Sequence, residues 1–175
     1  MKIGDKVSTL DQPVEHLVAC HRRIEERLET LLRAGAGLAT EREAALAAIA
    51  KSLEFLDSNG AWHTEDEEES FFPRLRRSLN PADLHYLHEL EMQHDGAEAV
   101  LEELRRSVAA MVAGQGTVNH YRQLAARLRE IYRAHIASEE EILFPLARQK
   151  FNRDDLDLIA VEMKARRNAV LCHTE

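Results

Sequence analysis

The chain of 175 residues has few cysteines, few residues that interrupt helices, and no long apolar run. Its two cysteines, Cys20 and Cys172, form no CxxC or zinc-ribbon spacing, so both are expected to be reduced thiols. The longest apolar run, Ala44 to Ala50, is far shorter than the about 18 residues that a membrane span requires. The first residues contain neither a secretory apolar segment nor a lipidation motif. We therefore expect a cytoplasmic protein that does not bind membranes.

Basic residues are also in deficit. The chain has 23 Lys and Arg against 31 Asp and Glu, a formal net charge of −8. This charge repels phosphate backbones and anionic lipids, which argues against nucleic acid or a membrane surface as a partner. Against that background, nine histidines are unexpected.

Strand patterns are absent as well, because no segment alternates apolar and polar residues and β-branched residues are few. Apolar residues instead recur at helical spacing in four long segments and one short one. The long helices are expected from Pro13 to about residue 35 or 38, from a capping box at 40–43, after Asn80-Pro81, and after the stretch 113–117; the short one starts at Asn152 and ends near 167. The fold class is all-α. The chain would form an up-down-up-down four-helix bundle over 13–150, with an N-terminal tail at 1–12 and an additional C-terminal helix and tail at 151–175.

One internal repeat organises the chain. The segment HTEDEEESFFPRLRRSLN from His63 matches HIASEEEILFPLARQKFN from His135, 72 positions later. Upstream, the segment from His21 matches the segment from His94 at a spacing of 73. The chain therefore consists of two helical hairpins that share one plan.

Helix rise places these histidines at one level. In the second hairpin, 19 residues separate His94 from the turn and 17 lead back to His135, a difference of roughly 3 Å at about 1.5 Å per residue. In the first hairpin the mismatch is roughly 8 Å, which a break at Asn59-Gly60 would absorb. Pro73 and Pro145 should kink their helices about two turns beyond the histidines, with Phe72 and Phe144 packing the core there.

A single histidine on an apolar stripe is usually a neutral imidazole bonded to a carbonyl. Four at one level, with Glu67 and Glu139 on the same face four residues after two of them, indicate a metal site. Glu67 and Glu139 would otherwise be buried carboxylates, each costing several kcal/mol, and a cation would compensate both. Two metals fit better than one, and imidazole with carboxylate and no thiolate suits non-haem iron, with manganese or mixed metals also compatible. The candidate ligands are His21, His63, Glu67, His94, His135 and Glu139.

The two HxxxE motifs, each followed by further glutamates and an aromatic-Pro pair, resemble those of the hemerythrin-like, or HHE cation-binding, domain family over about residues 13–150. The resemblance implies a four-helix bundle with an oxo- or hydroxo-bridged di-iron centre. It assigns His21 and His63 to one iron, His94 and His135 to the other, and Glu67 and Glu139 as bridges. The oxygen-carrying members have a fifth histidine, usually beside the one on the third helix, and here Leu90 and Glu98 stand at the positions four residues on either side of His94. Each iron would then keep an open position.

Several side chains near this centre have two interpretations. Glu25 and Glu98 would either complete the metal shells or lie on solvated helix faces, and the second interpretation is preferred. The remaining acids of the repeat are expected to be mostly solvated: Glu65, Glu68, Glu69, Glu140 and Glu141. The tyrosines and Trp62 are expected to pack, with Trp62 limiting solvent access. The other histidines are expected to be bystanders: His16, His85, His88, His120 and His173.

Three functions stay open at this point. The preferred one is a di-iron protein that binds or senses O2, NO, peroxide, or iron and redox state. The alternatives are a di-iron enzyme, such as a peroxidase, a ferroxidase or an NO-handling or iron-repair protein, and a metal-free helical interaction module. The preferred partners are a small diatomic ligand or peroxide, and the chain would be a monomer or a homodimer.

Overall fold

The computed structural model describes the backbone of residues 9–171 and the side chains of residues 10–168. The described residues are predominantly helical and contain no strand, which confirms the all-α prediction. The α-helices are α1 (Pro13–Gly37), α2 (Arg42–Phe55), α3 (Ala61–Glu65), α4 (Phe72–Ser78), α5 (Leu84–Val112), α6 (Val118–Ser138), α7 (Phe144–Lys150) and α8 (Arg153–Leu171). A short 3-10 helix, η1 (Thr9–Asp11), precedes them, and three π-helical turns lie between them: η2 (Leu56–Gly60), η3 (Asp66–Phe71) and η4 (Glu139–Leu143).

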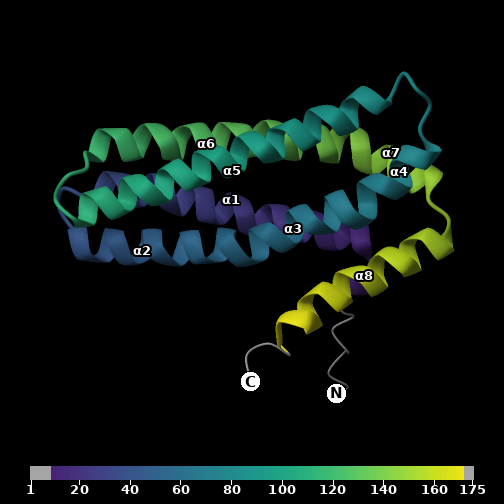
Figure 1. The fold of residues 1–175 in the computed structure, drawn as a ribbon, viewed down its shortest axis with the longest axis horizontal. Coiled ribbons are helices and arrows are strands. Elements are labelled where there is room, and N and C mark those ends of the chain that lie inside the picture. The colour runs from purple at the N-terminus through teal and green to yellow at the C-terminus, as the bar shows by residue number, and fades with distance from the viewer. Residues whose placement is uncertain (1–8, 172–175) are drawn as a thin grey trace, which may run out of the picture.

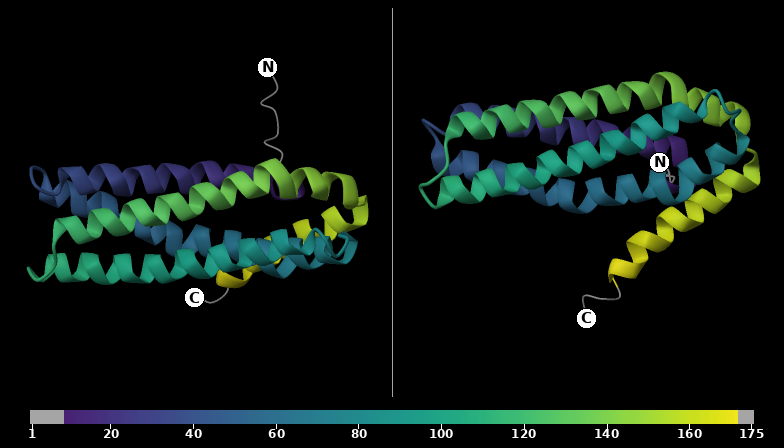
Figure 2. Two further views of the ribbon diagram at one scale, coloured as in Figure 1. Left: turned by 90° about the horizontal axis from the view of Figure 1, so that it is seen from above. Right: turned by 45° about the horizontal axis from the view of Figure 1, so that its top comes forward.

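The helices form an elongated bundle (Figures 1 and 2). One rod is α1, a second runs from α2 through α4, a third is α5, and a fourth runs from α6 through α7. The short connections 38–41 and 113–117 lie at the same end of the bundle (Figure 1). α8 leaves the opposite end and runs obliquely back along the outside (Figure 1).

The helix starts match the sequence signals in part. Pro13 occupies the first turn of α1, and Asn152 and Asp155 exchange hydrogen bonds between side chain and backbone at the start of α8. The capping box predicted at 40–43 is wrong, because no side chain caps α2. Backbone hydrogen bonds stabilise the short connection between α1 and α2 instead. The Thr40 and Glu41 N–H groups both donate to the Gly37 carbonyl.

The predicted break and kinks coincide with π-helical turns. At Asn59-Gly60 the chain does not leave the helix but passes through η2 into α3. η3 and η4 lie directly before the helices in which Pro73 and Pro145 occupy the first turn. A proline ring clashes with the carbonyl four residues upstream in a regular helix, and a widened turn relieves this clash without ending the rod.

Two apolar clusters fill the bundle, and the histidine level lies between them. The cluster towards the 38–41 and 113–117 connections includes Ile24, Leu56, Ala97 and Tyr132. The cluster at the other end includes Leu17, Phe71, Leu90 and Leu143. In each rod a histidine separates residues of the two clusters. The polar layer is therefore bounded by apolar packing at both ends.

α8 belongs to the second cluster. Its Ile159 and Met163 are fully buried there, and Arg74 of α4 binds Glu162 through two hydrogen bonds of 2.9 and 2.7 Å. The additional C-terminal helix therefore packs against one end of the bundle. None of the described helices is both long and apolar enough to cross a membrane.

Candidate metal centre

The structure brings together the four histidines of the repeat. His21 is fully buried, His63 and His135 are 2% exposed, and His94 is 8% exposed. The Nε2 atoms of His94 and His135 lie 3.1 Å apart, and the ring centroids of His21 and His63 lie 4.9 Å apart. Each rod thus contributes one imidazole to a common point in the core.

Glu67 lies between the two pairs of histidines. Its Oε1 is 3.2 Å from Nε2 of His63 and 3.9 Å from Nε2 of His21. Its Oε2 is 3.2 Å from Nε2 of His94 and 3.9 Å from Nε2 of His135. Each oxygen of one carboxylate therefore faces a different imidazole pair, the arrangement that a bridging ligand between two cations requires.

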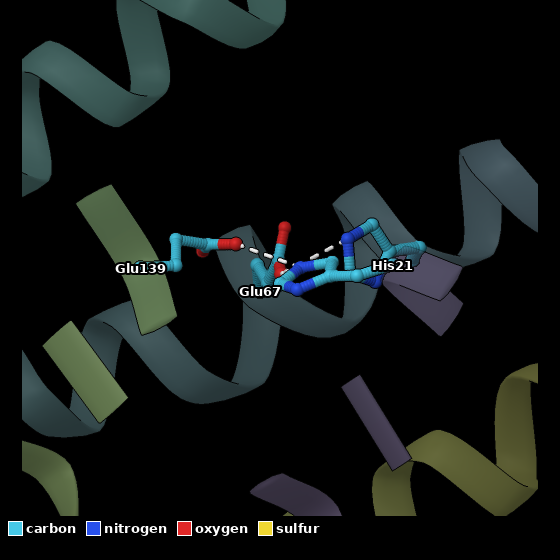
Figure 3. Close-up of side chains that lie close together, drawn as sticks. His21, Glu67 and Glu139 are labelled. Carbon is cyan, nitrogen blue, oxygen red and sulfur yellow. Dashed lines mark ion pairs between the residues drawn. The ribbon is translucent and has the colours of Figure 1, made fainter. Parts of the chain in front are cut away.

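Glu139 joins the same pairs from the fourth rod. Its Oε2 is 3.0 Å from Nε2 of His21 and 3.3 Å from Nε2 of His135. Figure 3 shows His21, Glu67 and Glu139 converging from separate elements. Two overlapping donor sets result, His21, His63, Glu67 and Glu139 in one and Glu67, His94 and His135 in the other, each with its candidate ligand atoms within 4.8 Å of one another.

Many of these polar atoms have no hydrogen bond. The buried atoms that make no hydrogen bond, although several lie close to one another, include both carboxylate oxygens of Glu67 and Glu139, both ring nitrogens of His63, and Nε2 of His21. A buried polar group without a partner costs roughly 1 to 3 kcal/mol, and more when it is charged. A cation bound to these atoms would satisfy them together, so the residues present fit a metal centre.

The electrostatics of the cluster favour positive charge. Burial by itself lowers the pKa of an imidazole, but the nearby carboxylates of Glu139 and Glu67 outweigh it at His135 and raise its pKa to about 10. The pKa values of His21 and His94 are raised for the same reason. At His63 burial dominates and lowers the pKa to about 4. The carboxylates thus attract either protons or metal ions into the layer between them.

A second pair of glutamates contacts two of the imidazoles. Glu68 is exposed, as predicted, and Glu140 is partly buried, but the prediction did not include their contacts to histidine. Glu68 Oε1 lies 2.7 Å from Nδ1 of His94, and Glu140 Oε1 lies 2.8 Å from Nδ1 of His21. The consecutive residues Glu67 and Glu68 therefore hold opposite edges of His94, as Glu139 and Glu140 hold His21. Carboxylates in this position fix the tautomer of a metal-binding histidine and raise its basicity. The sequence contained the signal, because the Glu-Glu pair itself recurs at a spacing of 72.

The aromatic residues of the repeat follow the same reciprocal plan. Phe72 stacks on His94 with a centroid distance of 6.0 Å, and Phe144 stacks on His21 at 5.6 Å, both with an interplanar angle of 9°. Both phenylalanines are fully buried, as predicted. Each HxxxEE…FP motif therefore positions a histidine of the other hairpin, so neither hairpin forms the site alone.

Asp66, which the sequence reading did not single out, is fully buried beside Glu67. Arg166 of α8 donates to its Oδ1 at 2.7 Å, and Arg167 donates to Oδ2 at 2.7 Å and to Oδ1 at 3.2 Å. The Arg167 guanidinium also lies 5.6 Å from the centroid of the half-buried Trp62 ring. α8 therefore binds Asp66, the residue directly before the candidate ligand Glu67.

Other predicted residues lie away from the cluster. Glu25 pairs with Arg22 and Glu98 with Arg105 through exposed side chains, and neither belongs to the two donor sets, in line with the preferred interpretation. Glu65, Glu69 and Glu141 are exposed, as expected. His16 is buried with Cys20 and Arg167, whereas His85, His88 and His120 are exposed. Cys20 is a free thiol whose pKa is raised by burial. His173 and Cys172 lie outside the described residues.

A groove of about 420 Å³ reaches His94 from the surface between η2–α3 and α5. Tyr132 of α6 lines it and is 9% exposed. Burial raises the pKa of its phenol to about 12. The prediction that Tyr132 packs in the core is right, but one side of it borders this groove.

The fold and the cluster together define a helical-bundle protein whose core contains His and Glu side chains able to hold a metal ion. The family model described as "Hemerythrin HHE cation binding domain" matches residues 12–147, and the chain belongs to this family. An uncharacterized protein of Haemophilus influenzae (strain ATCC 51907 / DSM 11121 / KW20 / Rd) is 28% identical over 162 residues, which cover 91% of this chain and 92% of that protein.

Proposed function

We propose that this chain is a non-haem di-iron protein that binds or senses a small molecule such as O2, NO or peroxide, or reports iron and redox state. The observation that carries the proposal is the position of Glu67, whose two oxygens face two different pairs of imidazoles. In an up-down-up-down bundle, His21 and His63 would hold one ion and His94 and His135 the other. Glu67 and Glu139 would be shared by both.

The donor set supports iron. Imidazole with carboxylate, no thiolate and positions left for a ligand is typical of non-haem iron, and manganese has compatible preferences. Bound iron would supply open coordination positions and reversible one-electron chemistry. The chain's own residues orient the imidazoles through Glu68 and Glu140 and bound the layer with an apolar cluster on each side.

Elemental analysis of anaerobically purified protein tests the proposal. We expect about two iron ions per chain and near-ultraviolet charge-transfer absorption after oxidation. His63→Ala and His135→Ala should each lose metal and absorption, whereas His88→Ala, at an exposed position on α5, should retain both. Circular dichroism of each variant shows whether it is folded. A wild-type chain that holds one metal ion or none would contradict the di-iron proposal.

An enzyme is the second candidate, and the groove beside His94 favours it, because it gives a substrate room next to the centre. A peroxidase or ferroxidase would turn over peroxide or ferrous iron faster than free metal does. A metal-free helical module is the third, and it would melt at the same temperature before and after chelation.

A further inference from the structure

The groove that reaches His94 has a distinct lining. Its walls come from η2 and α3 on one side and from α5 on the other, and Tyr132 of α6 closes part of it. Among the four imidazoles of the cluster, His94 is the most exposed, while His21 on the far side is fully buried. The groove therefore gives a small molecule a path to the His94–His135 half of the centre.

Tyr132 lines this groove, and its hydroxyl is available for a hydrogen bond. Among the described residues, none forms a hydrogen bond with this hydroxyl, and its oxygen is not among the fully buried polar atoms that lack a partner. Tyr121, on the same helix, behaves as a buried tyrosine usually does, because its hydroxyl donates to the Leu31 carbonyl at 2.8 Å. A phenol keeps its proton at neutral pH and can donate it in a hydrogen bond. Tyr132 is therefore a hydrogen-bond donor available to a molecule in the groove.

The charges along the groove restrict what enters it. Its lining contains Asp57, Glu65, Glu68, Asp95 and Glu98, whereas its basic residues are Arg105 and, at the inner end, His94 itself. Arg105 is already paired with Asp57, Glu98 and Glu102. An anion would pass several carboxylates before it reached His94, whereas an uncharged molecule would meet no such barrier.

We propose that this groove is the ligand site of the centre, that its ligand is a small uncharged molecule, and that Tyr132 donates a hydrogen bond to that ligand. The inference rests on the proposed function, because the ligand would lie beside the His94–His135 half of the metal centre. It adds the route, the chemical class of the ligand and a residue that recognises it.

Nitric oxide is a suitable probe, because it is uncharged and small. Anaerobic titration of the reduced, iron-loaded protein should give an affinity about fivefold weaker in Tyr132→Phe than in wild type, the size expected for one hydrogen bond. Tyr121→Phe is the matched control, and it should lower thermal stability but leave the affinity unchanged. Equal affinities in wild type and Tyr132→Phe would overturn the role of Tyr132.

The route is tested by filling the groove. Ala61 lines it and is exposed, so Ala61→Trp places an indole there without entering the core. This variant should bind nitric oxide more slowly than wild type. In the metal-free protein, methyl methanethiosulfonate, a small uncharged thiol reagent, should modify position 132 faster in Tyr132→Cys than in the double variant Tyr132→Cys/Ala61→Trp, as located by mass spectrometry. Tyr121→Cys, at a fully buried position, is the control and should react slowly. Unchanged association rates and equal modification of Tyr132→Cys with and without Ala61→Trp would show that the groove is not the route.

Metal content measured on the same samples separates the two proposals. Wild-type protein without two iron ions contradicts the proposed function itself. Full metal content together with wild-type nitric oxide binding in both Tyr132→Phe and Ala61→Trp contradicts only the groove and its ligand.

Discussion

Replacing Arg166 and Arg167 with leucine removes both cations that face the buried Asp66 carboxylate. Asp66 is fully buried, and the side chains of the two arginines are only 13% and 19% exposed. Three hydrogen bonds of 2.7 to 3.2 Å join Asp66 to them. Breaking a buried ion pair on one side typically costs about 3 to 5 kcal/mol, because the other charge is left without compensation.

For a chain of this size, each kcal/mol shifts the melting temperature by about 2 to 4 °C. The double leucine variant should therefore melt roughly 6 to 20 °C below wild type. The assay is thermal unfolding followed by circular dichroism on chelated protein, so that bound metal does not add to the stability. Arg153→Leu is the matched control on the same helix, because Arg153 is exposed and its pair with Asp157 should contribute less than about 1 kcal/mol.

The repeat itself provides the rescue. Ser138 occupies the position in the second motif that Asp66 occupies in the first, 72 residues earlier. Asp66→Ser should therefore recover most of the stability lost in the double leucine variant, because it removes the uncompensated carboxylate. The losses in free energy of unfolding are compared for Asp66→Ser, for the double leucine variant and for the combination of both. If the loss in the combination equals the sum of the other two to within about 0.5 kcal/mol, the ion-pair reasoning is wrong.

Three further predictions concern the centre and the backbone. Glu68→Gln and Glu140→Gln should each lower the affinity for metal about 10- to 100-fold, measured in competition with a chelator. Glu141→Gln is the control and should keep the wild-type affinity. Wild-type metal affinity in Glu68→Gln and Glu140→Gln would show that the contacts to His94 and His21 do not contribute to metal binding. Removing metal with a chelator should lower the melting temperature of wild type. The difference between the metal-loaded and the chelated protein should grow with the free metal concentration in the metal-loaded sample. Gly116→Ala should lower the free energy of unfolding by about 1 to 3 kcal/mol in denaturant unfolding, because the added Cβ would lie 2.6 Å from the Met111 nitrogen. Gly96→Ala is the control, because its added Cβ would meet open space, and it should not lower the free energy of unfolding.

The helical class and the grouping of the histidines could be predicted from the sequence, because both depend on periodicity. Apolar residues three or four positions apart define the buried stripes, and helix rise alone places His94 and His135 at one level. The π-helical turns were not predictable in this way. Asn59-Gly60 and the two prolines indicate that a regular helix is disturbed, but they do not say whether the chain breaks or widens. Tertiary packing on both sides keeps each rod continuous.

The residues that sequence reasoning missed all act across the two hairpins or through α8. Periodicity assigns a residue to a face of its own helix, and by that criterion Glu68 and Glu140 point away from the stripe. Their function depends on a histidine of the other hairpin, which a single helix cannot reveal. Asp66 is similar, because its partners are about 100 residues later. Repeat symmetry supplies the missing information. A residue shared by both motifs, such as Glu68 with Glu140, contacts a histidine of the common centre. A residue that differs between them, as Asp66 differs from Ser138, makes a contact that one motif alone needs, here the ion pairs with α8.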